Sequence, residues 1–335
     1  MIKNSDTQGN DYKTNKKYKH IKKIKLFGLI LLILTVIACK QKEQIIMESY
    51  KREVSVSVLL SKDATNIKIK WGDGAISNIN DSKINDDDWL VFFHKYIDEK
   101  LHNIVITVDN LQELRCSHNQ LTSLNIINCP ELRKIYCTNN RLTNLDISKC
   151  TELQTLFCHK NQLTRLNIGS CPKLEWISCD NNQLTSLDIS NCPEMRHLDC
   201  IENNLTTLDI SKCSRLMYLR CQQNQLTTLV VNKYNEELRG LYCEQNQLTS
   251  LNIGNCPKLV ELWCNYNQLT TLDISNCPRL SELRCSYNQL TSLNIINCPE
   301  LKKIDCTNNR LTTLDISKYT KLKDLDCDNN VKVQR

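Results

Sequence analysis

A segment of 21 residues is repeated through most of this chain, and an internal period of that length restricts the fold more than any other feature. Copies begin at Leu111 and follow one another in phase, with one extra residue in the sixth copy. Eleven copies, the last truncated, fit the frame L-x-x-L-x-C-x-x-N-x-L-T-x-L-x-I-x-x-C-x-x. Because a repeat this short cannot bury its own apolar face, it must stack on its neighbours, so the period predicts a solenoid over residues 111–335.

The core of this frame, L-x-x-L-x-C-x-x-N-x-L, resembles the leucine-rich-repeat family, and most closely its short bacterial versions, with cysteine in place of the third leucine. The resemblance covers residues 111–335. It implies a β-rich solenoid, a right-handed leucine-rich-repeat coil of about eleven 21-residue repeats with parallel strands. It also implies that the asparagine at position 9, from Asn119 to Asn330, forms a buried ladder that satisfies backbone groups of adjacent coils.

Cysteine is unusually abundant, but its placement argues against disulfides and metal binding. Of the 20 cysteines, eleven occupy position 6 and eight occupy position 19, one per coil in each series. Tyr234 and Tyr319 fill two further position-19 slots, so that site requires an apolar side chain and not a thiol. A buried free cysteine behaves as a small hydrophobic residue. We therefore predict core thiols, with no metal ligand, cofactor or catalytic cysteine among them.

The first 39 residues have the order of a secretory signal: a basic stretch, an apolar run from Leu26 to Ala38, and Cys39. The end of the run, Val36-Ile37-Ala38-Cys39, resembles the bacterial lipobox, which implies cleavage before Cys39 and attachment of lipid to it. The sequence therefore predicts a signal peptide over 1–38 and a lipidated tether over 39–52. The expected location is the bacterial cell envelope, with a lipid anchor in the outer membrane and either a surface-exposed or a periplasmic orientation. The alternative to a cleaved and lipidated leader is an uncleaved signal anchor.

Net charge gives no support for nucleic-acid binding. Eight lysines and only two acidic residues precede Cys39, and the remaining chain balances 35 basic against 35 acidic residues. The formal net charge of +6 therefore comes from the leader. A nucleic-acid-binding surface needs a concentration of positive charge, so this class of partner is not expected.

Residues 53–110 read as a separate β-rich segment. Apolar residues alternate in Val54, Val56 and Val58, which is the pattern of a half-buried strand. The order Trp71-Gly72-Asp73-Gly74, then His94 and Tyr96, resembles a PKD-type immunoglobulin-like β-sandwich. The alternative is a β cap that shields the first layer of the solenoid core. Neither reading predicts chemistry here, since turn formation accounts for Asp73.

Variation among the repeats is confined to one predicted face. If positions 4 and 6 point inward, positions 3, 5 and 7 point outward from the strand, with position 8 at its rim. Aromatic and arginine side chains are typical of binding hot spots, and several occupy these positions. The predicted ligand-binding residues are Tyr136, Phe157, Trp176, His197, Tyr218, Arg220, Tyr242, Trp263, Tyr266, Arg284 and Tyr287.

Three functions fit this face: an adhesin or other protein-binding module, a glycan-capture lipoprotein, and an envelope spacer without a ligand. The partner is expected to be a host or bacterial surface protein, or a glycan, and the lipid anchor is expected to contact the membrane. His159, Asp180, His197 and Asp199 lie on or near this face, but no fixed spacing marks a nucleophile, base and orienting group. No enzyme activity is expected.

Overall fold

The computed structural model describes residues 42–61, 64, 66–85, 88–231, 235–253 and 256–335. The predicted signal peptide, Cys39 and Tyr234 lie outside these residues. Residues Glu43–Arg335 form one compact unit. No helix in the described part of the chain is long and apolar enough to cross a membrane.

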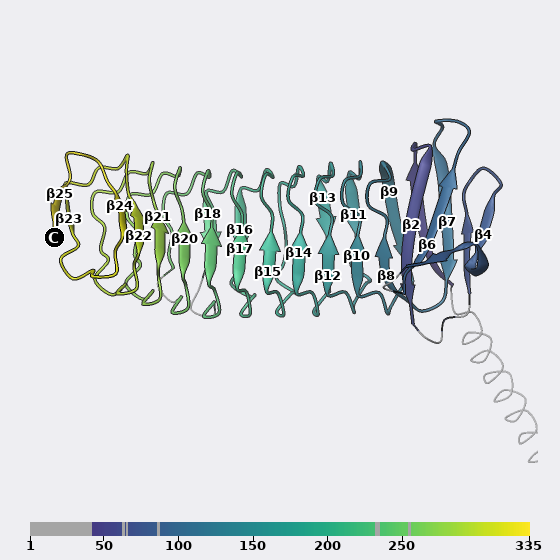
Figure 1. Cartoon of the computed structure of the whole chain (residues 1–335), viewed down its shortest axis with the longest axis horizontal. Helices are drawn as coiled ribbons and strands as arrows, with labels where there is room; N and C mark the ends of the chain where they lie inside the picture. Colours follow the sequence, from purple (N-terminus) through teal and green to yellow (C-terminus); the bar gives the residue numbers. More distant parts are fainter. Residues whose placement is uncertain (1–41, 62–63, 65, 86–87, 232–234, 254–255) are drawn as a thin grey trace, which may run out of the picture. The chain divides into compact units, whose positions relative to one another are not determined.

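Eleven parallel strands, one from each repeat, form a continuous row along the solenoid (Figure 1). Each residue in the row pairs with the residue at the same position of the next repeat, as Ile135 does with Leu156. The predicted β-solenoid with parallel strands is therefore confirmed. These strands are β8 (Leu111–Arg115), β10 (Lys134–Tyr136), β12 (Thr155–Phe157), β14 (Trp176–Ser178), β15 (His197–Asp199), β17 (Tyr218–Arg220), β19 (Gly240–Tyr242), β20 (Glu261–Trp263), β21 (Glu282–Arg284), β22 (Lys303–Asp305) and β24 (Asp324–Asp326).

Shorter ladders come from the second half of the repeat, where the sequence hardly changes. Parallel pairs join β11 to β13, β16 to β18 and β23 to β25. Their buried leucines, such as Leu145 and Leu208, belong to the same core as Ile135 and Leu198 of the main row. The strands in this half are β9 (Leu121–Ile127), β11 (Asn144–Asp146), β13 (Arg165–Asn167), β16 (Thr207–Asp209), β18 (Thr228–Val230), β23 (Thr313–Asp315) and β25 (Lys332–Gln334).

Cysteines fill the core as the repeat predicts. Nineteen described cysteines are free, and all but Cys327 are buried. Burial raises the pKa of these thiols, for example that of Cys137 to about 12, because the core disfavours the thiolate. Within the described residues, no cluster of three or more His, Cys, Asp or Glu side chains is placed to hold a metal ion.

The position-9 asparagines form a hydrogen-bond ladder. In one rung, Asn161 donates from Nδ2 to the carbonyls of Cys137 and Cys158, each at 3.0 Å, and its Oδ1 accepts from the Leu142 amide at 3.0 Å. The asparagines from Asn140 to Asn309 thus satisfy backbone groups in their own coil and in the preceding one, and Asn119 bonds in the same way to Cys116 and to Ser55. The structural role expected for these residues is confirmed from Asn119 to Asn309, whereas Asn330 in the last coil is exposed, because no further coil covers it.

The segment before the solenoid forms two sheets, and both continue into the first coil. One has the strand order β4-β3-β7-β1-β9; in the other, β5, β6 and β2 precede β8. The first coil therefore shares both of its sheets with this segment (Figure 1). Its elements are β1 (Glu43–Ser49), β2 (Glu53–Leu60), β3 (Ile67–Lys70), β4 (Ile76–Asn78), a 3-10 turn (Ile79–Asp81), β5 (Lys83–Ile84), β6 (Leu90–Lys95) and β7 (His102–Val108).

One boundary taken from the sequence is wrong. Residues 43–49, which we assigned to the tether, form β1 between β7 and β9, with Ile45 and Met47 fully buried. The alternation of Ile45 and Met47 with partly exposed residues is the strand signal, but the polar residues around it obscured that signal. Buried Glu43 adds a further contact, because its carboxylate accepts a hydrogen bond from the Leu111 amide at 2.9 Å.

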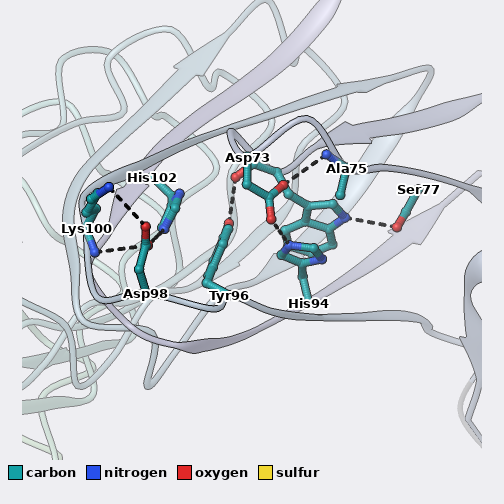
Figure 2. Close-up of polar contacts among 9 residues, drawn as sticks. Asp73, Ala75, Ser77, His94, Tyr96, Asp98, Lys100 and His102 are labelled. Atoms are coloured by element: carbon teal, nitrogen blue, oxygen red, sulfur yellow. Dashed lines mark hydrogen bonds and ion pairs between the residues drawn. The ribbon is translucent and has the colours of Figure 1, made fainter.

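Trp71, Asp73, His94 and Tyr96, which carry the PKD resemblance, meet in one network (Figure 2). Asp73 accepts from the Ala75 amide at 2.9 Å and lies 2.7 Å from Nε2 of His94. The Tyr96 hydroxyl donates to the Trp71 carbonyl at 2.7 Å, and both rings are buried. These contacts hold the 71–75 turn against β6 and give Asp73 a structural role in that turn.

Candidate binding face

The row of strands has the inward and outward alternation that the sequence predicts. On β10, Ile135 is buried, whereas Lys134 and Tyr136 on either side of it are partly exposed. The in-register pairing therefore arranges position 3 of all coils in one outward column and position 5 in another. The predicted site residues at these positions all lie on this surface, which we call the strand face.

Seven of them form a line of rings across the coils, which we call the aromatic track. The line starts in the position-5 column and crosses to position 3 between Phe157 and Trp176, whose centroids lie 5.3 Å apart. Trp176 then stacks on His197 at 4.8 Å, and His197 stacks on Tyr218 at 5.3 Å. The track comprises Tyr136, Phe157, Trp176, His197, Tyr218, Tyr242 and Trp263.

Tyr242 is the exception to the predicted exposure of the aromatic residues. Its side chain is buried, with 7% of its surface exposed, because it lies in the space over Gly240, which has no side chain. Its hydroxyl donates to the Glu261 carboxylate, and its ring packs edge-on against Trp263 at 5.0 Å. Burial and the Glu261 carboxylate raise the pKa of Tyr242. Its role is to support the track, and a ligand cannot reach most of its surface.

Arginines cover several ring faces of the track. The Arg284 guanidinium lies 4.0 Å from the centroid of Trp263, and that of Arg220 lies 5.6 Å from the centroid of Tyr242. At the start of the track, Arg115 lies 3.7 Å from the ring of Trp89 and 5.0 Å from that of Tyr136. Trp89 was not among the predicted site residues. It precedes the repeats, and no local sequence pattern shows that it contacts Arg115 of the first coil. These contacts fix the cations in place through attraction to the ring faces.

Tyr266 and Tyr287 form a separate pair at the rim. Both occupy position 8, and their rings stack with centroids 4.2 Å apart and 46% of each residue exposed. Their φ angles, 55° and 53°, lie in the left-handed region, as do those of position 8 in the other coils from the first to the tenth. This backbone turns the chain at the end of each strand and directs the side chain to the edge of the strand face.

A polar group of residues lies beside the track on coils 3 to 6. The buried Ser178 hydroxyl donates to Asp180 at 2.7 Å and lies 2.9 Å from Nδ1 of His159. Burial raises the pKa of Asp199, whose carboxylate lies 3.7 Å from Arg220, and burial lowers the pKa of His197. Asp180 contacts Ser178 and not His159. In a catalytic triad the acidic residue contacts the histidine base and orients it, so these three residues do not have that arrangement.

Three buried polar atoms on this face have no hydrogen-bond partner among the described residues: Oε1 of Gln222, Oε2 of Glu244 and Nε1 of Trp263. All three come from coils 6 to 8. Burial raises the pKa of Glu244. Buried polar atoms in proteins are nearly always paired, so these three need water or a bound partner to complete their hydrogen bonding.

Charge is unevenly distributed along the strand face. At positions 3, 5, 7 and 8, coils 1 to 6 carry four acidic and four basic residues. The same positions in coils 7 to 11 carry seven acidic residues and only Arg284 and Lys303 as basic ones. The seven acidic residues are Glu244, Glu261, Glu282, Asp305, Asp324, Asp326 and Asp328. Coils 7 to 11 therefore carry a net negative charge on the strand face.

Comparison with known proteins agrees with the repeat and the fold. A family model described as leucine-rich repeats in two copies matches residues 109–150 and 278–319. No curated protein matches the chain by sequence. The strand row, the core and these matches together show that residues 111–335 have the leucine-rich-repeat fold.

Among solved structures, the functional domain of InlJ from Listeria monocytogenes, described as including a cysteine ladder, is 28% identical with a TM-score of 0.53. The similarity covers 67% of this chain and 55% of that chain, so this chain spans little more than half its length. The leucine-rich-repeat domain of APL1B, at 24% identity and TM-score 0.52, covers 62% of this chain and 63% of that chain. The structure of PEPR1-AtPEP1 is 20% identical with a TM-score of 0.55, and the similarity covers 67% of this chain and 36% of that chain.

Proposed function

We propose that this chain is a protein-binding module whose strand face, centred on the aromatic track, contacts the partner. The observation that carries the proposal is that aromatic rings gather on this face in contact with one another, at positions whose residues change from coil to coil. Trp176, Tyr266 and Tyr287 are large, partly apolar side chains with over 40% of their surface exposed. Partly exposed aromatic and arginine side chains of this kind supply most of the binding energy at protein interfaces.

Polar groups on the same face offer hydrogen bonds to a partner. Gln222, Glu244 and Trp263 each keep a buried atom without a partner among the described residues. Leaving a buried polar group unpaired costs about 1–3 kcal/mol, so a partner that pairs these atoms gains that much affinity. A partner or an interfacial water can complete these hydrogen bonds.

The ring geometry favours a protein over a glycan. A sugar stacks on an aromatic side chain through an open ring face. Here one face of Trp176 is occupied by His197, and Arg284 lies over a face of Trp263. The ring edges and the stacked tyrosine pair remain for contact, which suits apolar and aromatic side chains of a protein.

We also propose a cellular location and a membrane anchor for this protein. Val36-Ile37-Ala38-Cys39 supports lipid attachment at Cys39, with the protein tethered to the outer membrane and acting as an adhesin at the cell surface. The network of Trp71, His94 and Tyr96 within two sheets supports a PKD-like sandwich for the segment before the solenoid.

Paired variants test the binding proposal. Immobilised wild type and a Trp176→Ala/Tyr287→Ala variant are used to capture proteins from extracts of bacterial envelopes and of candidate host cells. The matched control is Val230→Ala/Ile296→Ala, which removes two exposed apolar side chains outside the strand face. Captured proteins are quantified by mass spectrometry. We expect the strand-face variant to lose at least tenfold of a specific partner and the control to retain it; equal capture by both variants contradicts the proposal.

Oligosaccharide competition separates the protein and glycan readings. A mixture of free oligosaccharides released from the same extracts is added during capture. We expect no loss of the captured partner. Two results together would establish glycan capture instead. The oligosaccharide mixture would displace the captured partner, and the immobilised chain would still capture glycan from an extract whose proteins have been digested.

Localisation has its own test. Surface proteolysis of intact cells, with a periplasmic protein as control, is expected to remove the protein, and a Cys39→Ser variant is expected to lose incorporation of labelled palmitate. Full protection from the protease contradicts surface exposure, and unchanged palmitate labelling contradicts lipidation at Cys39.

A further inference from the structure

The strand face does not end at the first coil. On its other edge, β8 pairs antiparallel with β2, and the register places Ser57 opposite Arg115 and Leu59 opposite Glu113. Directly opposed residues of neighbouring strands lie on the same face of a sheet. Ser57 and Leu59 therefore belong to the same surface as the outward columns of the solenoid, although they precede the first repeat by more than 50 residues.

The next strand extends this surface further. β6 pairs with β2 so that Val91 lies opposite Ser57 and Phe93 lies opposite Ser55. The intervening residues Val56 and Phe92 are buried on the other side of the sheet. Val91 and Phe93 are thus directed to the strand face, two strands beyond β8.

Phe93 is exposed there without support from other rings. It has 65% of its surface exposed, and within the described residues no aromatic ring packs against it. Its opposite residue, Ser55, is small. In the aromatic track the rings cover one another, but the ring of Phe93 is open to a partner. A large exposed apolar side chain at the end of a row of partly exposed rings marks an interaction surface.

Arg115 joins the two parts of the surface. Its guanidinium contacts the buried ring of Trp89, which precedes β6, at 3.7 Å and the ring of Tyr136, in the second coil, at 5.0 Å. Arg115 therefore links Trp89 to Tyr136, the first ring of the aromatic track. The N-terminal segment and the solenoid present one surface across this junction.

We propose that the segment before the repeats forms part of the binding face, and that one protein partner spans it from Phe93 to the acidic coils. This inference rests on the proposed protein-binding function. Val91, Phe93 and Leu59 call for an apolar area on the partner, and the seven acidic residues of coils 7 to 11 call for basic groups at its other end. The occupant is thus a polypeptide that is apolar at one end and basic at the other.

Site-specific photocrosslinking tests this arrangement. The photoreactive residue p-benzoylphenylalanine replaces Phe93, Trp176 or Asp326 in separate full-length variants, and Ile84 in a matched control. Ile84 is 70% exposed on the same sheet, but it lies opposite Leu90, which pairs with buried Val58, and so it occupies the other side. Each variant is irradiated with the extract from which the wild type captures proteins, and the crosslinked peptides are sequenced.

We expect positions 93 and 176 to crosslink to the same protein and position 84 to give at least tenfold less product. Position 326 is expected to join a peptide of that protein in which Lys and Arg outnumber Asp and Glu. A product at 176 without one at 93, or equal products at 93 and 84, overturns the extended face and leaves the proposed function intact. An acidic peptide at 326 overturns the assigned partner chemistry, and no product at either 93 or 176 overturns both proposals.

Discussion

Tyr242 occupies the space that Gly240 leaves on the strand face. A Cβ at residue 240 would lie 2.8 Å from Cε2 of Tyr242 and 2.8 Å from Cδ1 of Tyr218. Glycine therefore lets two rings that are one coil apart approach each other. The aromatic track continues across coil 7 because the residue in its position-3 column has no side chain.

Replacing Gly240 with Ala is expected to expose Tyr242. The new methyl group overlaps both rings, and Tyr242 is the one whose far end can swing outward, at a cost in stability of about 1–2 kcal/mol. Nitration by tetranitromethane, which attacks exposed phenolate, reports this: residue 242 should react slowly in the wild type, where burial raises its pKa, and faster in Gly240→Ala. Nitration at Tyr266 is the internal control. Equal rates at residue 242 in both proteins would show that the ring does not depend on the glycine.

The repeat predicted most of the architecture. Eleven in-phase copies specify the coil, and the alternation of buried leucine and cysteine specifies which side of each strand faces inward. Tyr242 could not be predicted, because its burial depends on Gly240 in the neighbouring column. The continuation of the face to Phe93 depends on the pairing of β2 with β8, between residues separated by more than 50 positions, and no local pattern encodes that pairing.

The asparagine ladder predicts a large local loss of stability. In Asn203→Ala, the buried Leu184 amide loses its acceptor and the Cys179 and Cys200 carbonyls lose a donor, which costs roughly 3 kcal/mol. Asn330→Ala, at the exposed position 9 of the last coil, should cost well under 1 kcal/mol by the same reasoning. Urea unfolding, combined with hydrogen exchange of coils 4 and 5, measures the difference. Similar losses for the two variants would refute the structural role of the ladder.

Buried thiols predict a loss of stability at alkaline pH. Burial raises the pKa of Cys171 to about 11 and that of Cys137 to about 12, above the value of about 8.5 expected for an exposed thiol. Unfolding therefore releases protons above the unfolded pKa. The stabilisation is fully present below about pH 8.5 and is lost as the pH rises through 11 and 12.

The urea midpoint should thus be constant near pH 7–8 and fall steeply between pH 9 and 11. A Cys171→Ala/Cys298→Ala variant, which lacks two of these thiols, should show a shallower fall. A midpoint that does not change up to pH 11 would mean that the thiols are not held protonated by the core.

The acidic half of the strand face predicts salt-sensitive binding. Asp324→Asn/Asp326→Asn removes two exposed charges, and the dissociation constant for the captured partner should rise about three- to tenfold through slower association. Glu131→Gln/Glu236→Gln removes two exposed acidic residues outside the strand face and serves as the control. The difference should shrink at high salt, where such charges are screened. Tighter binding by the Asp324→Asn/Asp326→Asn variant would indicate an acidic partner.

Hydroxyl-radical footprinting of the protein with and without the captured partner tests the binding face most directly. Radicals oxidise exposed side chains, so each residue reports its own accessibility. We predict that binding reduces oxidation of Trp176, Tyr266 and Tyr287 at least threefold, while exposed Ile296, outside the strand face, is unaffected. Protection of Ile296 with unchanged oxidation of the three aromatic residues would place the partner elsewhere and contradict the account.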